Sequence, residues 1–252
     1  MKTTPILGAS MVAIMAATAP AFAENLLRWT SQGDALTLDP HSQNEGPTIA
    51  MNSFIYETLV TQDPSLAFQP ALAESWTAAP DGWTMKLRKG VKFHDGADFT
   101  AEDVVFSFER AKSESSDYKE QAENVVSVEV IDDHTVKLIT NGPNPILPNQ
   151  LTTLYMMDKD WSEANNVATP QDYAAGEETF AVRNANGTGA FTLVSRAPDE
   201  LTVMARNPAW WGEGKFPGNI DRIEYRPIGN AATRVAALLS GEVDFLLDPP
   251  TG

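Results

Sequence analysis

Residues 72–110 read LAESWTAAPDGWTMKLRKGVKFHDGADFTAEDVVFSFER, and this stretch decides the fold. Its first half predicts a strand at Trp83–Arg88, because the Pro80–Gly82 segment directly before it has a typical turn composition. A second turn with glycine at both ends, Gly90–Gly96, closes this strand. The stretch therefore begins with β structure and changes to another kind of element after Gly96.

The second half of the stretch predicts a helix with a well-marked start. Thr100 is the expected N-cap residue, and Asp103 stands three residues later, where its carboxylate can accept the N-cap backbone N–H. Val104, Phe108 and Ala111 then recur at helical spacing. A strand, a turn and a capped helix in one run indicate a mixed α/β protein.

The same stretch resembles a family signature. The pattern AESW…DG.T…LR.GVKFHDG..FTAEDV.FS.ER is similar to the signature region of the family 5 extracytoplasmic solute-binding proteins, which are dipeptide-, oligopeptide- and nickel-binding components of ABC importers. Further motifs agree along the chain from residue 24 to 252: LDPH at 38–41, NGTGAF at 186–191, NPAWWG at 207–212 and GEVDF at 241–245. Ala190 and Trp210 depart from the proline and tyrosine that are usual in the family.

The resemblance implies an α/β fold of the periplasmic binding protein type II kind, with two lobes around a ligand cleft. Lobe I is expected at residues 24–60 and 186–252, with a small subdomain inserted at 61–185. Family members continue through a second lobe, so we expect this chain to be incomplete and to lack lobe II. It would then expose an apolar cleft face and bind ligand poorly by itself.

The N-terminus has the features of a cleavable signal peptide at residues 1–23. Lys2 supplies a positive charge, residues 6–19 are apolar, and Ala21-Phe22-Ala23 is a typical cleavage sequence. The chain contains no cysteine, which excludes a lipid-modified cysteine and a disulfide framework. The sequence therefore predicts a periplasmic protein without a lipid anchor.

The formal net charge of −16 makes nucleic acid an unsuitable partner, because phosphate binding requires a basic surface. The three histidines at positions 41, 94 and 134 are far apart and have no metal-ligand spacing. We expect no metal, no cofactor and no catalytic residue. A secreted hydrolase is the alternative from another functional class, although no nucleophile motif supports it.

The resemblance places the ligand beside the loop that precedes the first helix. In peptide-binding members this loop lies along the cleft and its backbone pairs with the extended ligand, which by position implicates Asn44, Glu45 and Gly46. Tyr118 is a further carry-over, since an aromatic residue in this area contacts ligand in peptide-binding relatives. The alternative is an ordinary capped loop in which Glu45 only favours the helix dipole.

The function implied by the resemblance is capture of a small solute, a dipeptide or oligopeptide in the first place. Nickel chelates, opines and oligosaccharides are the alternative ligands within the same family. The expected partners are the ABC permease and its ATPase in the inner membrane, and the receptor itself is expected to be a monomer that closes about a hinge.

Periodicity and turn residues predict the remaining elements. The expected strands, helices and hairpins are a strand at Leu26–Ser31, a helix from Pro47 with a core stripe of Met51, Ile55 and Leu59, hairpins at 125–131/135–140 and 191–195/201–206, a strand at Ile220–Arg226, and a helix from Asn230 to Ser240 that stops at Gly241.

Three more local features carry expectations. Residues 158–186 are polar and are expected to be irregular. Gly187 and Gly189 indicate a close backbone crossing, since glycine permits such an approach. Trp210 and Trp211 are adjacent, so in an extended segment they would point in different directions.

Overall fold

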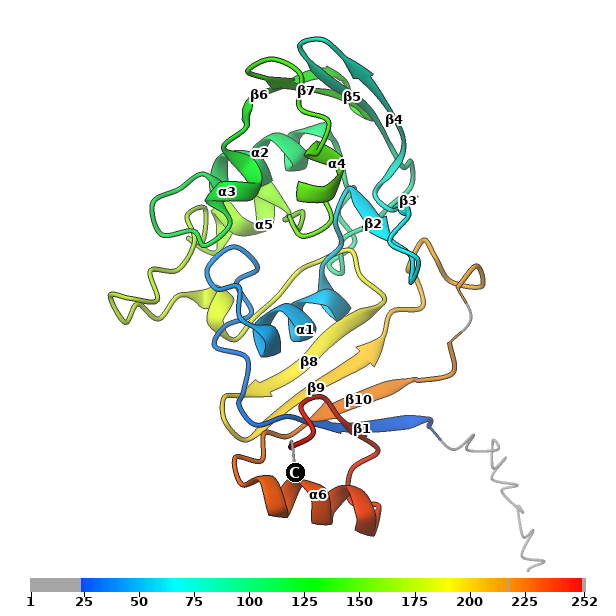
Figure 1. The fold of residues 1–252 in the computed structure, drawn as a ribbon, viewed down its shortest axis with the longest axis vertical. Helices are drawn as coiled ribbons and strands as arrows, with labels where there is room; N and C mark the ends of the chain where they lie inside the picture. The colour runs from blue at the N-terminus through cyan, green and yellow to red at the C-terminus, as the bar shows by residue number, and fades with distance from the viewer. Residues whose placement is uncertain (1–23, 217, 251–252) are drawn as a thin grey trace, which may run out of the picture.

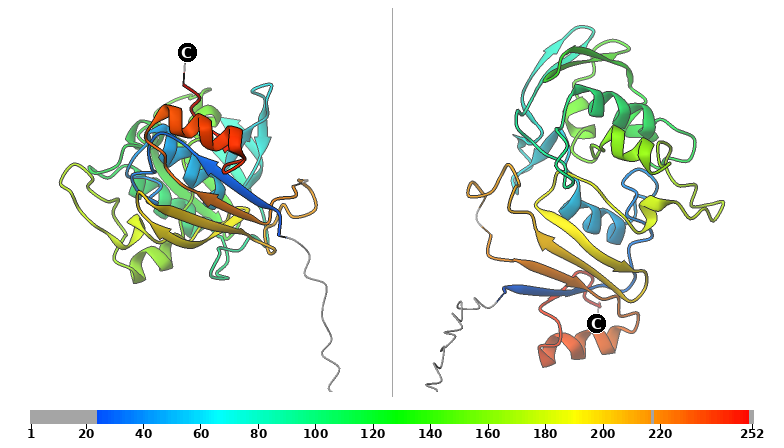
Figure 2. Two further views of the ribbon diagram at one scale, coloured as in Figure 1. Left: turned by 90° about the horizontal axis from the view of Figure 1, so that it is seen from below. Right: turned by 180° about the vertical axis from the view of Figure 1, so that it is seen from behind.

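The computed structural model describes residues 24–216 and 218–250 (Figure 1). The predicted signal peptide at residues 1–23 lies outside the described residues. The chain forms a lower body and an upper body, with the blue N-terminal strand and the red C-terminal helix both in the lower one (Figures 1 and 2).

The lower body is built on a five-stranded sheet with the order β11-β1-β10-β9-β8. The strands are β1 (Leu26–Thr30), β8 (Phe191–Ala197), β9 (Leu201–Arg206), β10 (Arg222–Tyr225) and β11 (Phe245–Leu246). β1 runs parallel to β10 and β11, whereas β10, β9 and β8 are antiparallel neighbours. Helix α1 (Gly46–Ile55) packs on this sheet, and α6 (Ala231–Ser240) lies beside β11 (Figure 1).

The upper body is built on a four-stranded antiparallel sheet with the order β4-β5-β7-β6. Its strands are β4 (Ala73–Ala79), β5 (Gly82–Leu87), β6 (Val125–Asp132) and β7 (Thr135–Thr140), and a small hairpin joins β2 (Val60–Gln62) to β3 (Phe68–Pro70). The helices are α2 (Ala101–Ala111), α3 (Lys119–Ala122), α4 (Leu147–Gln150), α5 (Lys159–Ala164) and a 3-10 turn at Phe180–Val182. Helix α2 covers the sheet through contacts with β6 and β7.

The described residues bury two hydrophobic cores. One lies between α2 and the four-stranded sheet and contains Val104, Phe108 and Leu138. The other lies between α1 and the five-stranded sheet. Tyr155 and Met157 belong to this second core although they fall inside the 61–185 segment. The subdomain boundaries stay a prediction.

Several local signals predicted from the sequence are confirmed. The Asp103 carboxylate accepts the backbone N–H of Thr100 at 2.8 Å, and α2 starts directly after this residue. The hairpin between β6 and β7 and the hairpin between β8 and β9 form where they were predicted. Asn230 caps α6 by accepting the Thr233 N–H at 2.9 Å, and Gly241 ends the helix with φ of +75°.

The predicted length of the first helix is wrong. Helix α1 ends at Ile55, so Leu59 is buried from an extended segment and does not continue the helical stripe. The cause is a contact from far along the chain, because the Ile55 carbonyl accepts the N–H of Gly189 at 2.8 Å. The expected close crossing at Gly187 and Gly189 is confirmed by this contact.

The expectation that residues 158–186 are irregular is also partly wrong. Helix α5 lies inside this range, and its N-cap Asp158 accepts the Trp161 N–H at 2.9 Å.

No helix among residues 24–216 and 218–250 has the length and apolar character needed to cross a bilayer.

Candidate functional site

The loop before α1 presents unpaired backbone groups at the surface. Within the described residues, the backbone N–H groups of Gln43, Asn44 and Glu45 donate no hydrogen bond. The carbonyl oxygens of Gln43 and Asn44 accept none. Asn44 and Gly46 are exposed, and α1 begins at Gly46, so the positive end of its dipole adjoins the loop. Backbone of this kind is available to pair with an extended ligand.

The Glu45 side chain turns back onto the protein. Its carboxylate accepts hydrogen bonds from the Thr48 hydroxyl and, at 3.4 Å, from the backbone N–H of Leu36. Glu45 occupies the N-cap position of α1, but its side chain makes no hydrogen bond to a backbone N–H of the helix. The Glu45 carbonyl accepts the Ile49 N–H at 3.0 Å, so the part of Glu45 that remains open is its backbone N–H.

The structure brings Tyr118 close to this loop. The Asn44 side-chain amide donates to the Asp117 carbonyl at 3.3 Å, and the Asp117 N–H donates to the His41 carbonyl at 3.1 Å. The Tyr118 ring itself is only 2% exposed, and its centre lies 6.0 Å from that of the His41 ring. Burial raises the pKa of the Tyr118 hydroxyl above its ordinary value. Ligand contact by Asn44, Glu45, Gly46 and Tyr118 stays a prediction.

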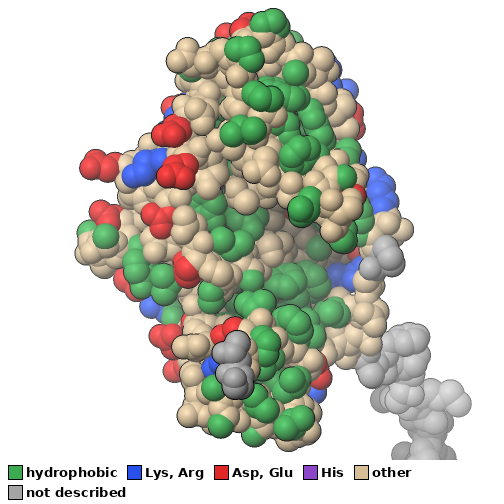
Figure 3. Space-filling view, viewed as in Figure 1, with side chains coloured by type: hydrophobic (Ala, Val, Ile, Leu, Met, Phe, Trp, Pro, Cys, Tyr) green, Lys and Arg blue, Asp and Glu red, His purple; other side chains and the backbone are tan. Residues whose placement is uncertain are grey.

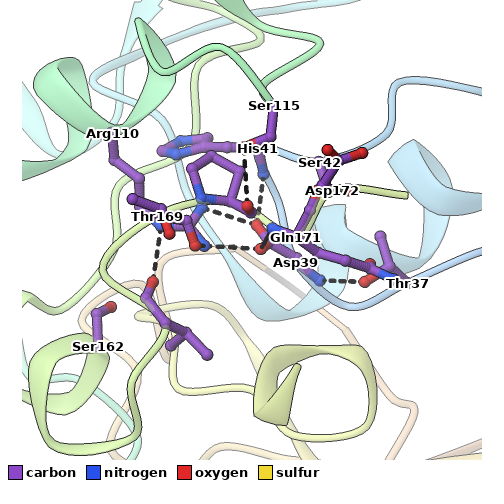
Figure 4. A network of polar contacts seen from close by, with 12 residues as sticks. Thr37, Asp39, His41, Ser42, Arg110, Ser115, Ser162, Thr169, Gln171 and Asp172 are labelled. Carbon is purple, nitrogen blue, oxygen red and sulfur yellow. Dashed lines mark hydrogen bonds and ion pairs between the residues drawn. The ribbon is translucent and has the colours of Figure 1, made fainter. Parts of the chain in front are cut away.

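A buried ion pair lies beneath the loop (Figure 4). Arg110 of α2 donates to both carboxylate oxygens of Asp39 at 2.7 Å, and both side chains are fully enclosed. The Arg110 guanidinium also donates to the carbonyls of Val167 at 3.0 Å and Thr169 at 3.1 Å. Burial opposes ionisation of Asp39, but the charge and hydrogen bonds of Arg110 hold its pKa below the usual range.

His41 is buried beside this pair as a neutral ring. Its Nε2 lies 2.8 Å from the Tyr155 carbonyl, which requires a proton on that nitrogen. The Nδ1 atom is buried without a partner among the described residues. Burial, followed by the nearby charge of Arg110, lowers the pKa of His41 to about 3.

This pKa predicts a loss of stability on acidification. Protons bind His41 in the unfolded chain below its ordinary pKa of 6.5 but do not bind the buried ring, so stability falls as pH decreases from about 6.5 toward 3. We expect His41 alone to account for about 1.5 kcal/mol of unfolding free energy between pH 6.5 and pH 5. Urea unfolding at a series of pH values measures this slope.

The variant His41→Gln is expected to remove that share, because glutamine keeps an N–H donor for the Tyr155 carbonyl and does not titrate. His94 is also partly buried with a lowered pKa, so some slope remains. His134→Gln, in the turn between β6 and β7, is the matched control. An equal slope in the two variants would contradict the prediction.

A second polar centre, at Glu57, was not anticipated from the sequence. Both indole N–H groups of Trp210 and Trp211 donate to its carboxylate at 2.9–3.0 Å, and the Thr188 hydroxyl donates at 2.8 Å. The expectation that the two tryptophans point in different directions is wrong, because they lie in a turn rather than a strand. Burial raises the pKa of Glu57, although these three donors oppose the shift.

A cavity of about 320 Å³ adjoins Glu57 where the two bodies meet. The lining residues include Tyr56, Pro70, Tyr155, Trp210, Trp211 and Phe216. The Arg88 guanidinium stacks on the Trp211 ring at 3.9 Å, which joins the end of β5 to the turn that carries the tryptophans. The available signal in the sequence was a carboxylate between apolar residues in Ile55–Leu59, together with the tryptophan pair.

Hydrophobic side chains gather on one face of the lower body (Figure 3). A groove of about 380 Å³ beside α1 and β11 is lined by Leu27, Trp29, Ala50, Phe54, Phe245 and Leu247. Apolar surface of this kind is typical of contact with further polypeptide or a ligand.

No group of three or more His, Asp or Glu side chains in the described part of the chain is placed to hold a metal ion.

Three longer proteins are similar to this chain. The glutathione-binding protein GsiB of Salmonella choleraesuis (strain SC-B67) is 29% identical over 218 residues, which cover 85% of this chain and 40% of that protein. The periplasmic binding protein DppA of Helicobacter pylori, in complex with the peptide STSA, matches with a TM-score of 0.75 and 30% identity over 90% of this chain and 47% of that one. MoaA from A. tumefacien R10, in complex with mannopinic acid, matches with a TM-score of 0.75 and 28% identity over 88% of this chain and 44% of that one.

The fold therefore defines the class, which is that of the type II periplasmic binding proteins. The profile of the bacterial extracellular solute-binding proteins, family 5 Middle, matches residues 67–252. The chain belongs to this family, and both the predicted family and the predicted fold class are confirmed. The chain spans slightly less than half the length of the relatives it matches.

Proposed function

We propose that this chain serves as the solute-capturing part of an ABC importer. It acts in the periplasm as a monomer after removal of its signal peptide, and it delivers its ligand to a permease and ATPase complex in the inner membrane. Membership of the solute-binding family supports this proposal. The observation that carries it is the open backbone of Gln43–Glu45 at the start of α1.

The ligand that best fits this backbone is a dipeptide or oligopeptide. An extended peptide has alternating N–H and C=O groups, which match free groups of both kinds in the loop. Two of the similar proteins are described with peptides, namely glutathione and STSA. Affinity from backbone pairing would leave ligand side chains free to vary.

Ligand binding is testable by thermal unfolding of the purified chain with millimolar glutathione and STSA peptide. Millimolar concentrations offset the poor affinity expected of this chain by itself, so we expect a peptide to raise the melting temperature, because a ligand at 100 times its Kd adds about 2.7 kcal/mol of stability. A rise with mannopinic acid or nickel–histidine alone would replace the peptide assignment by another solute. No rise with any of these compounds, or turnover of the peptide, would contradict the receptor function.

The loop backbone is testable with a matched pair of variants. Glu45 has φ of −76°, which proline can adopt, and its N–H makes no hydrogen bond within the described residues. Glu45→Pro removes the side chain and the N–H, whereas Glu45→Ala removes only the side chain. We expect peptide affinity to be about fivefold lower in the proline variant than in the alanine variant, the value of one backbone hydrogen bond of about 1 kcal/mol. Equal affinities would exclude pairing at this position.

A further inference from the structure

One buried network joins three segments that are distant in the sequence (Figure 4). Its centre is the pair of Asp39 and Arg110, described above. The Asp39 carboxylate also accepts the backbone N–H of His41 at 3.1 Å and that of Gln171 at 2.9 Å. Arg110 reaches the Val167 carbonyl from the other side. These hydrogen bonds are directional, so together they fix the positions of the segments relative to one another.

The two parts of the candidate ligand site are attached to this network. Ser42, the residue before the open loop, donates its hydroxyl to the Gln171 carbonyl at 2.9 Å. Ser115, shortly before Tyr118, donates its hydroxyl to the Pro170 carbonyl at 2.9 Å. The open loop itself makes few internal hydrogen bonds, so its path depends on the structure beneath it.

An ion pair is a costly way to obtain stability in this place. Removing two charges from water offsets most of their attraction, and well-packed apolar side chains of similar volume are often at least as stable. The pair instead fixes the orientation of the two segments that carry it, since the planar guanidinium binds a carboxylate in one fixed geometry. Its carbonyl contacts extend that orientation to residues 167–171.

We propose that Asp39 and Arg110 are positioning residues that hold the open loop Gln43–Gly46 and the Ser115–Tyr118 segment in the arrangement that binds ligand. This inference rests on the proposed function for its ligand, but the positioning itself can be measured without one. The pair acts through the backbone and has no contact with the ligand. It determines the distance between the loop backbone and the Tyr118 segment.

The deciding variant is Asp39→Leu/Arg110→Met in the 252-residue chain, which replaces the pair by apolar side chains. Amide hydrogen exchange by NMR reports the attachment at two sites: the Ser42 N–H, which donates to the Asp39 carbonyl, and the Asp117 N–H, which donates to the His41 carbonyl. We expect exchange at both sites to be at least tenfold faster than in the unmodified chain. Val136→Ala, on β7 in the hydrophobic core of the upper body, is the control with lowered stability and an intact pair.

Glutathione and STSA peptide are the probes for the binding arm. We expect the double variant to bind at least tenfold more weakly, and Val136→Ala to bind within twofold of the unmodified chain. If the unmodified chain binds neither probe, the peptide assignment of the proposed function fails, while the exchange rates still decide the positioning role. Exchange in the double variant equal to that in Val136→Ala would overturn the inference.

Arg110→Lys provides a second variant in case the double variant does not fold. Lysine keeps the charge but cannot bind both carboxylate oxygens and the two carbonyls in the same geometry. We expect the same two amides to exchange faster in this variant, and unchanged exchange would also overturn the inference.

Discussion

Replacing Arg110 with alanine is expected to lower the free energy of unfolding by about 3–5 kcal/mol. The variant leaves Asp39 as a buried carboxylate whose two strongest donors are missing, while it still lies at 0% exposure. It also leaves the carbonyls of Val167 and Thr169 without the guanidinium N–H groups that they accept. Urea unfolding at neutral pH measures the loss.

Arg28→Ala is the matched control for this prediction. Arg28 also pairs with an aspartate, Asp244, at 2.8 Å, but the two side chains are 40% and 37% exposed. Water replaces the lost contact at an exposed pair, so we expect a much smaller loss of stability than in Arg110→Ala. If Arg110→Ala and Arg28→Ala cost the same, Asp39 would have an alternative partner or would be protonated in the folded protein.

The helix caps are features that can be predicted from the sequence. The capping of α2 by Thr100 and Asp103 and the cap of α6 at Asn230 depend on residues three positions apart, and both were predicted. Such signals are local, because the partner is found within one turn of the same helix. The family motifs extend this local information to the fold class.

The buried pair could not be predicted in the same way. Asp39 and Arg110 are separated by 71 positions, and each is explained locally, the first by a break before Pro40 and the second by the end of α2. The same holds for Glu57, whose tryptophan donors lie 153 and 154 positions away. Periodicity cannot identify which polar groups share a buried site, since that depends on how the bodies pack.

The candidate ligand site falls between these two cases. The position of Asn44–Gly46 before α1 followed from the resemblance, and the structure adds that the backbone there is open. The turned-back side chain of Glu45 was not predictable, because it depends on Leu36 and Thr48. Ligand pairing through the loop backbone, as the resemblance implied, stays a prediction, and the Glu45 carboxylate is engaged by Thr48 and Leu36.

Gly187→Ala is expected to lower the free energy of unfolding by about 3 kcal/mol. A Cβ atom at this position would lie 2.0 Å from the carbonyl oxygen of Ile55, which is backbone and cannot turn aside. The crossing would have to open, and the His94 N–H, which donates to the Gly187 carbonyl at 2.9 Å, would be displaced with it. The end of α1 and the neighbouring Glu57 would shift as well.

Gly33→Ala is the control, because a Cβ atom there meets no atom within 4 Å. We expect that variant to stay within about 0.5 kcal/mol of the unmodified chain in urea unfolding. A similarly small effect of Gly187→Ala would mean that α1 and the crossing segment at residues 187–189 can separate without loss of packing. Since the Gly189 N–H that bonds to the last residue of α1 lies in the same crossing, a large effect would show that this contact from far along the chain stabilises the end of the helix that follows the open loop.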